Sequence, residues 1–233
     1  KYYLKDSHRL AEIAHALAFH FQTAGMIEKT VPYYTLAGNY ALQLSASRAA
    51  IDHFQQALYH LQALPASAQH DWQALDLHLS LGPPITATCG WAAPELEVNY
   101  RKIEEFCNKI EDDPRLVPAL WLLAVYRLGR AEHATVDRLV ERLYKLAQAI
   151  GNPDLICLAN LQVSPLYQGR LVEARQILNR ASLPRDIDQQ RSLAYRYGMS
   201  PSVVGLAYLA HCVWLLGDPE QANQHSQEAL ELA

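Results

Sequence analysis

The residues best suited to chemistry stand together in one stretch, RSLAYRYGMSP at positions 191–201. It combines the planar cations of Arg191 and Arg196 with two tyrosine rings and a glycine. A guanidinium group binds carboxylates or phosphates through paired hydrogen bonds and also stacks on aromatic rings. Two interpretations follow: a ligand site with an arginine facing a binding groove, or a clasp that fastens this segment to adjoining helices. We favour the clasp.

Ten histidines offer a second source of chemistry, metal binding. Zinc sites on a helix favour histidines three or four residues apart together with a third ligand. His53 and His60 are seven apart, which is about 10.5 Å along a helix. His15 and His20 are five apart. Neither spacing suits one ion, so we expect no metal site, and solvated or capping histidines instead.

Acid–base catalysis would need paired carboxylates in a cleft that shifts their pKa values. Glu95, Glu97, Glu104 and Glu105 lie close together in the sequence. Glu95 falls in the first turn of an expected helix, where the helix dipole favours a carboxylate. We expect the other three on a solvated face rather than in a catalytic pair.

Motifs of several enzyme classes are absent: there is no G-x-x-x-x-G-K-[ST] loop, no H-E-x-x-H and no G-x-S-x-G. The GPP at 82–84 cannot cradle a phosphate, because prolines lack amide donors. Cys89, Cys107, Cys157 and Cys212 form no close pair, so we expect buried, reduced thiols. The sequence predicts no enzyme, no metal and no cofactor.

The composition indicates a folded protein that binds neither nucleic acid nor membrane. Half of the 233 residues are hydrophobic, and the formal net charge is −4, with no basic run. No stretch approaches the roughly 20 apolar residues that cross a bilayer, and the N-terminus lacks a signal-peptide pattern. We expect a cytoplasmic protein. Because the chain opens without Met and ends in a helical pattern, we interpret it as a piece of a longer protein.

Helical periodicity runs through nearly the whole chain. Leu10, Ile13, Ala14 and Leu17 follow the i, i+3, i+4, i+7 spacing of one apolar helix face. Signals of β-hairpins, such as Asn-Gly, are absent. Proline and glycine punctuate the periodic segments as helix stops and starts, and the GPP at 82–84 is one such break. We predict about eleven or twelve helices joined by short turns.

Internal repeats organise these helices. The clearest unit is VVGLAYLAHCVWLLGDPEQANQHSQEAL, residues 203–230. In a repeat frame of about 34 residues, its small residues occupy positions 8, 15, 20 and 27. They are Ala210, Gly217, Ala222 and Ala229. Small side chains at these positions let the two helices of a hairpin approach closely. This unit resembles the tetratricopeptide family.

The same repeat frame fits upstream segments. Thr30 departs from the small-residue pattern of the first unit, and residues 67–111 match worst because the GPP interrupts them. The first two units overlap, so one helix at about 28–44 would serve both. The matching residues, unit by unit, are Ala18, Gly25 and Ala37; Gly38, Ala50, Phe54 and Ala57; the degenerate pair Ala131 and Val136; and Gly169, Ala174 and Ala181.

One helical hairpin cannot bury its apolar face alone, whereas stacked hairpins bury a continuous core. We predict a single all-α domain over residues 1–233, a right-handed α-α superhelix of tetratricopeptide-like hairpins with a concave groove. About twenty residues separate the last two hairpins, where a few would suffice. We therefore assign residues 182–202, which include RSLAYRYG, to an insertion between hairpins.

Three long runs carry a closer resemblance, which covers the chain from about residue 8 to its end. They are HRLAEIAHALAFHFQTAGMIEKTVPYYTLAGNYALQLSASRAAIDHFQQAL, LGPPITATCGWAAPELEVNYRKIEEFC and QQRSLAYRYGMSPSVVGLAYLAHCVWLLGDPEQANQHSQEAL. The chain is similar to the helical tail that follows the P-loop ATPase module of large bacterial signalling proteins, namely class III adenylate/guanylate cyclases, LuxR-type or activator-type transcriptional regulators, and multidomain kinases. The resemblance implies a sensor and scaffold that regulates an ATPase or output domain.

In tetratricopeptide arrays, the first helix of each hairpin lines the groove, through positions 2, 5, 6, 9, 12 and 13. The resemblance implies an aromatic-rich groove with few charges, which suits the capture of a peptide or a partner helix. In the last unit these positions are Val204, Ala207, Tyr208, His211, Trp214 and Leu215. The first unit contributes Glu12, His15, Phe19 and Gln22.

The candidate partner or ligand groove combines such positions with the two arginines of the insertion. Its residues are Trp121, Val125, Asn160, Tyr167, Tyr208, His211, Arg191 and Arg196. The alternative is that the rings pack against neighbouring helices. We favour core packing for Trp121 and Trp214, and groove exposure for Tyr167 and Tyr208.

Two functions compete. The first is binding of a partner protein or peptide, or of a neighbouring ATPase or output domain in the same polypeptide. The second is sensing of a small-molecule effector, a metabolite or sugar held in the groove by aromatic side chains, Asn160, His211 and the arginines. A lysine-rich clamp for acidic C-terminal peptides is missing. Exposed apolar ends of an array also allow a homodimer.

Overall fold

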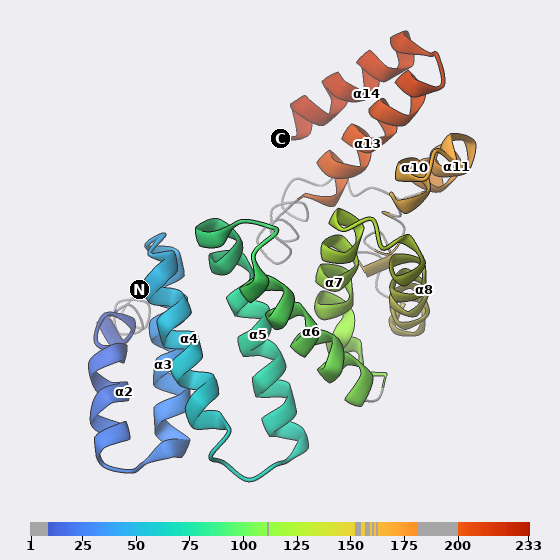
Figure 1. The fold of residues 1–233 in the computed structure, drawn as a ribbon. Helices are drawn as coiled ribbons and strands as arrows, with labels where there is room; N and C mark the ends of the chain where they lie inside the picture. Colours follow the sequence, from blue (N-terminus) through green and yellow to red (C-terminus); the bar gives the residue numbers. More distant parts are fainter. Residues whose placement is uncertain are drawn as a thin grey trace. The chain divides into compact units, whose positions relative to one another are not determined.

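The structure is a computed structural model, and it describes residues 9–110, 112–151, 155–156, 159, 161, 163–180 and 200–233. Within these ranges the chain forms eleven α-helices, one short 3-10 helix and no strand (Figure 1). The all-α prediction is confirmed. The chain divides into two compact units, Lys1–Glu111 and Asp112–Ala233. None of the helices in the described ranges has the length and hydrophobicity of a membrane span.

Five helices build the described part of the first unit, and each packs against the next along the chain. Short turns join them, so that the order of packing follows the order of the sequence (Figure 1). The helices are α2 (Ala14–Thr23), α3 (Ile27–Gln43), α4 (Ser47–Leu61), α5 (Ala68–Cys89) and α6 (Pro94–Lys109).

Helix α3 is shared by two hairpins, as the overlap of the first two repeat units predicts. It packs against both α2 and α4. At the second of these contacts, Gly38 has no side chain and the ring of Phe54 lies against its backbone. Thr30 departs from the small-residue pattern, yet it is fully buried, and its hydroxyl donates a hydrogen bond to the Met26 carbonyl at 3.1 Å. The buried hydroxyl is therefore satisfied.

Seven helical elements build the described part of the second unit. Helix α7 packs against α8, α10 against α11, α11 against α13, and α13 against α14. The elements are η1 (Pro114–Leu116), α7 (Val117–Gly129), α8 (His133–Ile150), α10 (Ser164–Tyr167), α11 (Leu171–Arg180), α13 (Pro201–Leu215) and α14 (Pro219–Leu232).

Position 15 of the repeat frame has a backbone role that the sequence pattern did not indicate. In each of the five repeat units, this residue lies in the turn between the two helices and adopts a left-handed conformation. The next amide bonds to the carbonyl five residues back, as from Ala46 to Ala41 at 2.8 Å, which closes the helix end. A β-carbon at Gly25, Gly169 or Gly217 would meet nothing within 4 Å. The requirement is therefore the backbone angle and not close helix approach. The φ angles are 71° at Gly25, 57° at Ser45, 58° at Ala131, 74° at Gly169 and 89° at Gly217.

The GPP at 82–84 does not end a helix, contrary to the prediction. It lies inside α5, which runs unbroken from Ala68 to Cys89. Each proline removes one amide donor from the helical ladder. However, Leu81, Pro84 and Ile85 are buried, and α5 packs against both α4 and α6. Tertiary packing therefore outweighs the local preference of two prolines.

Several predictions lie outside the described residues. They concern Asn160, Cys157 and most of the 182–202 insertion, including Arg191 and Arg196. The described chain resumes at Ser200, whose hydroxyl accepts a hydrogen bond from the Val203 amide at 3.5 Å and caps α13. Pro201 is the first residue of that helix, a position that suits proline because its fixed φ matches the first turn.

The described cysteines only partly follow the prediction of buried thiols. Cys107 and Cys212 are buried, but Cys89 is exposed at the C-terminal end of α5. A cysteine in the last turn of a helix is not covered by the packing of the helix body. Cys89 is therefore open to solvent.

Candidate functional site

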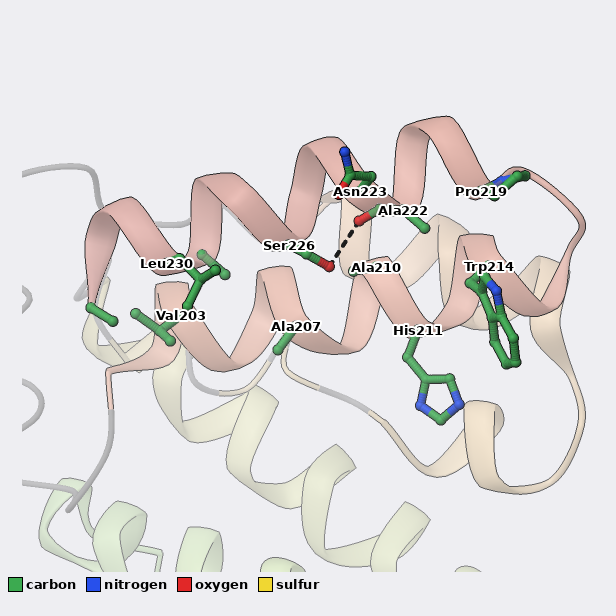
Figure 2. A pocket seen from close by; sticks show the side chains of 12 residues that line it. Val203, Ala207, Ala210, His211, Trp214, Pro219, Ala222, Asn223, Ser226 and Leu230 are labelled. Carbon is green, nitrogen blue, oxygen red and sulfur yellow. Dashed lines mark hydrogen bonds between the residues drawn. The ribbon is translucent and has the colours of Figure 1, made fainter.

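A pocket of about 770 Å³ lies along the hairpin formed by α13 and α14 (Figure 2). Val203 and Leu230 stand at one end, and Trp214 and Pro219 at the other. The lining contains no lysine, arginine, aspartate or glutamate, so the pocket offers a mainly apolar surface. Its residues are Val203, Ala207, Ala210, His211, Trp214, Pro219, Ala222, Asn223, Ser226, Ala229, Leu230 and Ala233.

Local sequence signals fix the two walls of this pocket. Gly217 takes the left-handed turn conformation, and the carboxylate of Asp218 accepts a hydrogen bond from the Gln221 amide at 3.0 Å. This N-cap starts α14 directly after the turn. Ala210 and Ala222 are both buried, and their small side chains let α13 and α14 pack closely. The pocket is thus a property of the hairpin itself.

The groove positions selected in the last repeat unit lie on the open face of α13. Trp214 is 59% exposed. The favoured core packing of this tryptophan was therefore wrong. Ala207, His211 and Trp214 line the pocket, whereas Val204 and Tyr208 do not. The structure thus brings together half of the selected positions at one site.

Tyr167 and Tyr208 form a pair at the surface of the second unit, where the sequence placed both in the groove. Their ring centroids are 6.2 Å apart at 73°, in an edge-to-face arrangement. The Tyr167 hydroxyl donates to the Tyr208 hydroxyl at 3.4 Å, which is a long contact. Burial and the Tyr167 hydroxyl raise the pKa of Tyr208 to about 12. The Tyr208 hydroxyl therefore stays protonated at physiological pH, and the two rings offer apolar edges with polar tips.

Two further candidate residues, Trp121 and Val125, are described and do not line the pocket between α13 and α14. Trp121 is only 7% exposed and packs in the interior of the second unit, as the core alternative predicts. Val125, one turn further along α7, is half-buried. Asn160, Arg191 and Arg196 lie outside the described residues, so both the clasp and the arginine site stay predictions.

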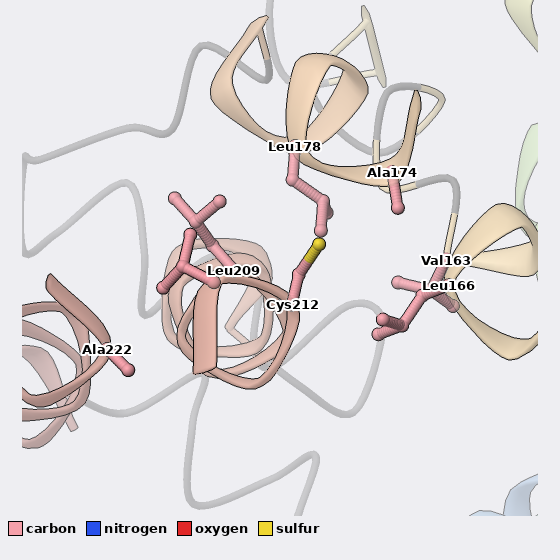
Figure 3. Close-up of a cluster of buried hydrophobic side chains, with 8 residues drawn as sticks. Val163, Leu166, Ala174, Leu178, Leu209, Cys212 and Ala222 are labelled. Carbon is pink, nitrogen blue, oxygen red and sulfur yellow. The ribbon is translucent and has the colours of Figure 1, made fainter. Parts of the chain in front are cut away.

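A hydrophobic cluster surrounds α13 and holds the helix in place, and one of its members, Ala222, also lines the pocket (Figure 3). At its centre Cys212 is fully buried, and its thiol donates to the Leu171 carbonyl at 3.2 Å. Burial raises the pKa of this thiol, which keeps it protonated and unreactive. The cluster comprises Val163, Leu166, Ala174, Leu178, Leu209, Cys212, Val213 and Ala222.

The first unit contains a cluster of imidazoles around Tyr34. The His15 and His53 ring centroids are 4.9 Å apart, and Tyr34 stacks on His60 at 5.9 Å. The Tyr34 hydroxyl donates to the Gln22 side-chain oxygen at 2.6 Å. His60 is 8% exposed, so it is neither solvated nor a cap, contrary to the prediction. A stacking partner 26 residues away in sequence explains its burial.

Burial also lowers the pKa of His60, and its Nε2 atom has no hydrogen-bond partner among the described residues. Burial, followed by the nearby His15, lowers the pKa of His53, while Asp52 opposes the shift. These rings are therefore held neutral at physiological pH. No group of three metal-ligating side chains converges within the described ranges.

The repeat frame selected only three of the twelve lining residues, mainly because it takes groove residues from the first helix of each hairpin alone. Asn223, Ser226 and Leu230 come from the second helix, α14. The sequence did contain a signal for the pocket residues of α14. Ala222, Ser226 and Ala229 follow the i, i+4, i+7 spacing of one helix face. Small residues at that spacing leave a shallow channel along a helix.

Comparison with solved structures shows the fold. The crystal structure of BtubC (BKLC) from P. vanneervenii matches with a TM-score of 0.66 at 14% sequence identity, and the match covers 98% of this chain and 88% of that one. A second structure, MamA MSR-1 C2, matches with a TM-score of 0.48 at 16% identity, over 87% of this chain and 95% of that one. No protein-family model and no curated protein sequence matches the chain. The first likeness supports an all-α helical-repeat fold.

Proposed function

We propose that this chain is a non-catalytic interaction and sensor module that binds a partner protein through the pocket between α13 and α14. The observation that supports this is an apolar pocket of about 770 Å³ with Trp214 standing 59% exposed at one end. Exposed apolar patches with aromatic anchors are typical of protein-binding surfaces. The Tyr167 and Tyr208 pair extends the aromatic surface of this unit.

The partner we propose is an ATPase or output domain of a bacterial signalling protein or transcriptional regulator, in the same polypeptide or separate from it. The sequence resemblance to the helical tails of such proteins supports this context. We propose a cytoplasmic, non-catalytic role, because the sequence carries no G-x-x-x-x-G-K-[ST], H-E-x-x-H or G-x-S-x-G motif.

A small-molecule effector is the second candidate, and the size of the same pocket favours it. Ligand pockets commonly measure about 300–1,000 Å³ and combine apolar walls with a few polar groups. Asn223 and His211 supply such groups here. A metabolite or sugar bound at this place would make the hairpin a sensor.

Site-specific photocrosslinking tests the proposed function. When a photoreactive residue replaces His211 in the full-length bacterial protein, it should form a crosslink to the partner, either a separate protein or a domain of the same polypeptide. The same residue in place of Gln62, which is exposed in the first unit, should not. Trp214→Ala should reduce the crosslink at least fivefold, because it removes the largest anchor of the pocket.

Trp91→Ala is the matched control, because Trp91 is 58% exposed in the first unit and lies far from the pocket in sequence. It should leave the crosslink unchanged. Equal crosslinking from positions 211 and 62 would contradict the proposal. If a metabolite panel raises the melting temperature while no protein crosslinks, the small-molecule alternative is favoured.

A further inference from the structure

The shape of the pocket between α13 and α14 favours a helical occupant. Its middle is lined by small side chains, and larger ones stand at the ends, with Trp214 at one and Leu230 at the other (Figure 2). Small residues allow close approach of a second backbone, and the large ones can pack between its side chains as ridges pack into grooves. The small lining residues are Ala207, Ala210, Ala222, Ser226 and Ala229.

The polar groups of the walls point to the same occupant. Both walls are α-helices, whose backbone groups are already paired within each helix. Ser226 also donates its hydroxyl to the Ala222 carbonyl at 2.9 Å. An extended peptide would bring unpaired backbone groups against these walls, whereas a helix satisfies its own.

The hairpin of α13 and α14 contains acidic residues but no lysine or arginine. Residues 200–233 contain four of the 24 acidic residues of the chain and none of its 20 lysines and arginines. Their formal charge is therefore −4, which equals the formal net charge of the whole protein. The other 199 residues carry 20 charges of each sign. An acidic surface of this kind is complementary to a basic partner.

Two of these carboxylates are exposed on the same side of α14. Glu220 and Glu231 are both exposed. They are eleven residues apart, which is close to three full turns and about 16.5 Å along the helix. They therefore lie on the same side of α14, beside the stripe that contains Asn223 and Leu230. The guanidinium of Arg175 reaches α14 at Gln221, which is not a lining residue.

We propose that the pocket between α13 and α14 binds an amphipathic partner helix with an aliphatic face and two lysines or arginines about eleven positions apart. This inference rests on the proposed function and specifies the partner's chemistry. The aliphatic face fills the small-residue channel between Trp214 and Leu230. The two basic side chains pair with Glu220 and Glu231 along the edge of the pocket.

A charge-swap experiment on the full chain tests this. The probe is a fluorescein-labelled helical peptide of sixteen residues with leucines along one face and lysines at positions 3 and 14, and its twin has glutamates at those two positions. Fluorescence anisotropy should show tighter binding of the lysine peptide. Glu220→Lys/Glu231→Lys should weaken the lysine peptide by about tenfold, as expected for two exposed ion pairs.

The same double variant should bind the glutamate peptide more tightly than the wild type does. Glu141→Lys/Glu173→Lys changes the net charge equally at two exposed positions on α8 and α11, and should alter binding less than twofold. Trp214→Ala should weaken the lysine peptide more than tenfold. Circular dichroism and the melting temperature confirm that each variant is folded.

Several outcomes would overturn the inference: equal binding of both peptides, no binding of either, or binding that survives Trp214→Ala. Suppose that neither peptide binds. A dimer that dissociates on Trp214→Ala would then assign the pocket to a second copy of the chain, and a metabolite that stabilises the protein would assign it to a small molecule. If the photocrosslink from position 211 persists while both peptides fail, the partner chemistry is wrong and the proposed function stands. If that crosslink is also absent, both fail.

Discussion

The ring of Phe54 on α4 lies against the backbone of Gly38 on α3, so closely that a β-carbon on Gly38 would be 2.5 Å from the ring carbon Cε1. Phe54 is fully buried, so the ring cannot swing out into solvent. This contact fixes the spacing of the two helices and makes Gly38 a position where even a methyl group does not fit.

Gly38→Ala should lower the free energy of unfolding by about 2 kcal/mol, because overpacking costs more than alanine gains in helix propensity. Urea denaturation measures this. Gly129→Ala is the control: Gly129 also lies in a helix, but its β-carbon would meet nothing within 4 Å. That change should be neutral or stabilising by up to about 1 kcal/mol. Strictly additive effects of Gly38→Ala and Phe54→Leu would argue against the contact as the cause.

Ala131→Gly should stabilise the protein, because Ala131 holds a φ of 58° that glycine adopts without strain. We expect a gain of about 0.5–1 kcal/mol after the entropy cost of glycine in the unfolded state. Ala149→Gly, at an exposed position within α8, should instead destabilise by about 1 kcal/mol. Paired thermal and urea unfolding of the two variants checks the opposite signs. A loss of stability in both would show that the turn residue is not strained.

Asn99→Ala should destabilise the first unit by about 1–3 kcal/mol. His78 donates from Nδ1 to the Asn99 side-chain oxygen at 2.8 Å, and the Asn99 amide donates back to the His78 carbonyl at 2.9 Å. Asn99 is 5% exposed, so water cannot replace these bonds that tie α5 to α6. Asn108→Ala, at an exposed position on α6, should change stability by less than about 0.5 kcal/mol. Equal effects of the two changes in urea titrations would contradict a structural role for the bonds.

Stability should fall on mild acidification. Burial lowers the pKa of His53 and of His60, with His15 adding to the shift at His53 and Asp52 opposing it. The unfolded chain then binds protons that the folded chain does not. The contribution of these two histidines to the free energy of unfolding is fully present above the ordinary histidine pKa of about 6.5. It is lost as the pH falls through their lowered pKa values.

His60→Phe should flatten this pH dependence, because phenylalanine keeps the stacking on Tyr34 and has no proton to bind. Urea midpoints measured at several pH values from neutral to mildly acidic would show it. His20→Phe, which alters an exposed ring on α2, should keep the wild-type slope. An unchanged slope for His60→Phe would mean that His60 does not drive the acid sensitivity.

The repeat frame predicted those parts of the fold that depend on local spacing. It predicted that one helix serves the first two hairpins, and α3 occupies nearly that range. Its matching residues also include the position where the chain reverses in four of the five turns, but not Ser45, and the physical reason is a backbone angle and not side-chain size. The break at the GPP was wrong, because the packing of α5 depends on neighbours that local sequence does not reveal.

The candidate site was less predictable, since exposure depends on which elements cover a helix. Trp121 and Trp214 are both groove positions of the repeat frame, yet one is 7% and the other 59% exposed. His60 looked like a surface residue, and its burial depends on Tyr34 in another helix. Periodicity identifies the apolar face of a helix, but not which neighbour packs on that face.

The concentration of charge in the last hairpin also affects kinetics. The field of the four carboxylates in residues 200–233 acts on a diffusing molecule before any side chain touches it, and its range is about 8 Å at physiological ionic strength. Basic molecules should therefore arrive at residues 200–233 faster than neutral ones of equal size, and salt should slow their arrival. Departure depends instead on the apolar contacts around Trp214. For the proposed basic partner helix, the carboxylates should therefore raise the association rate, and Trp214 should lower the dissociation rate.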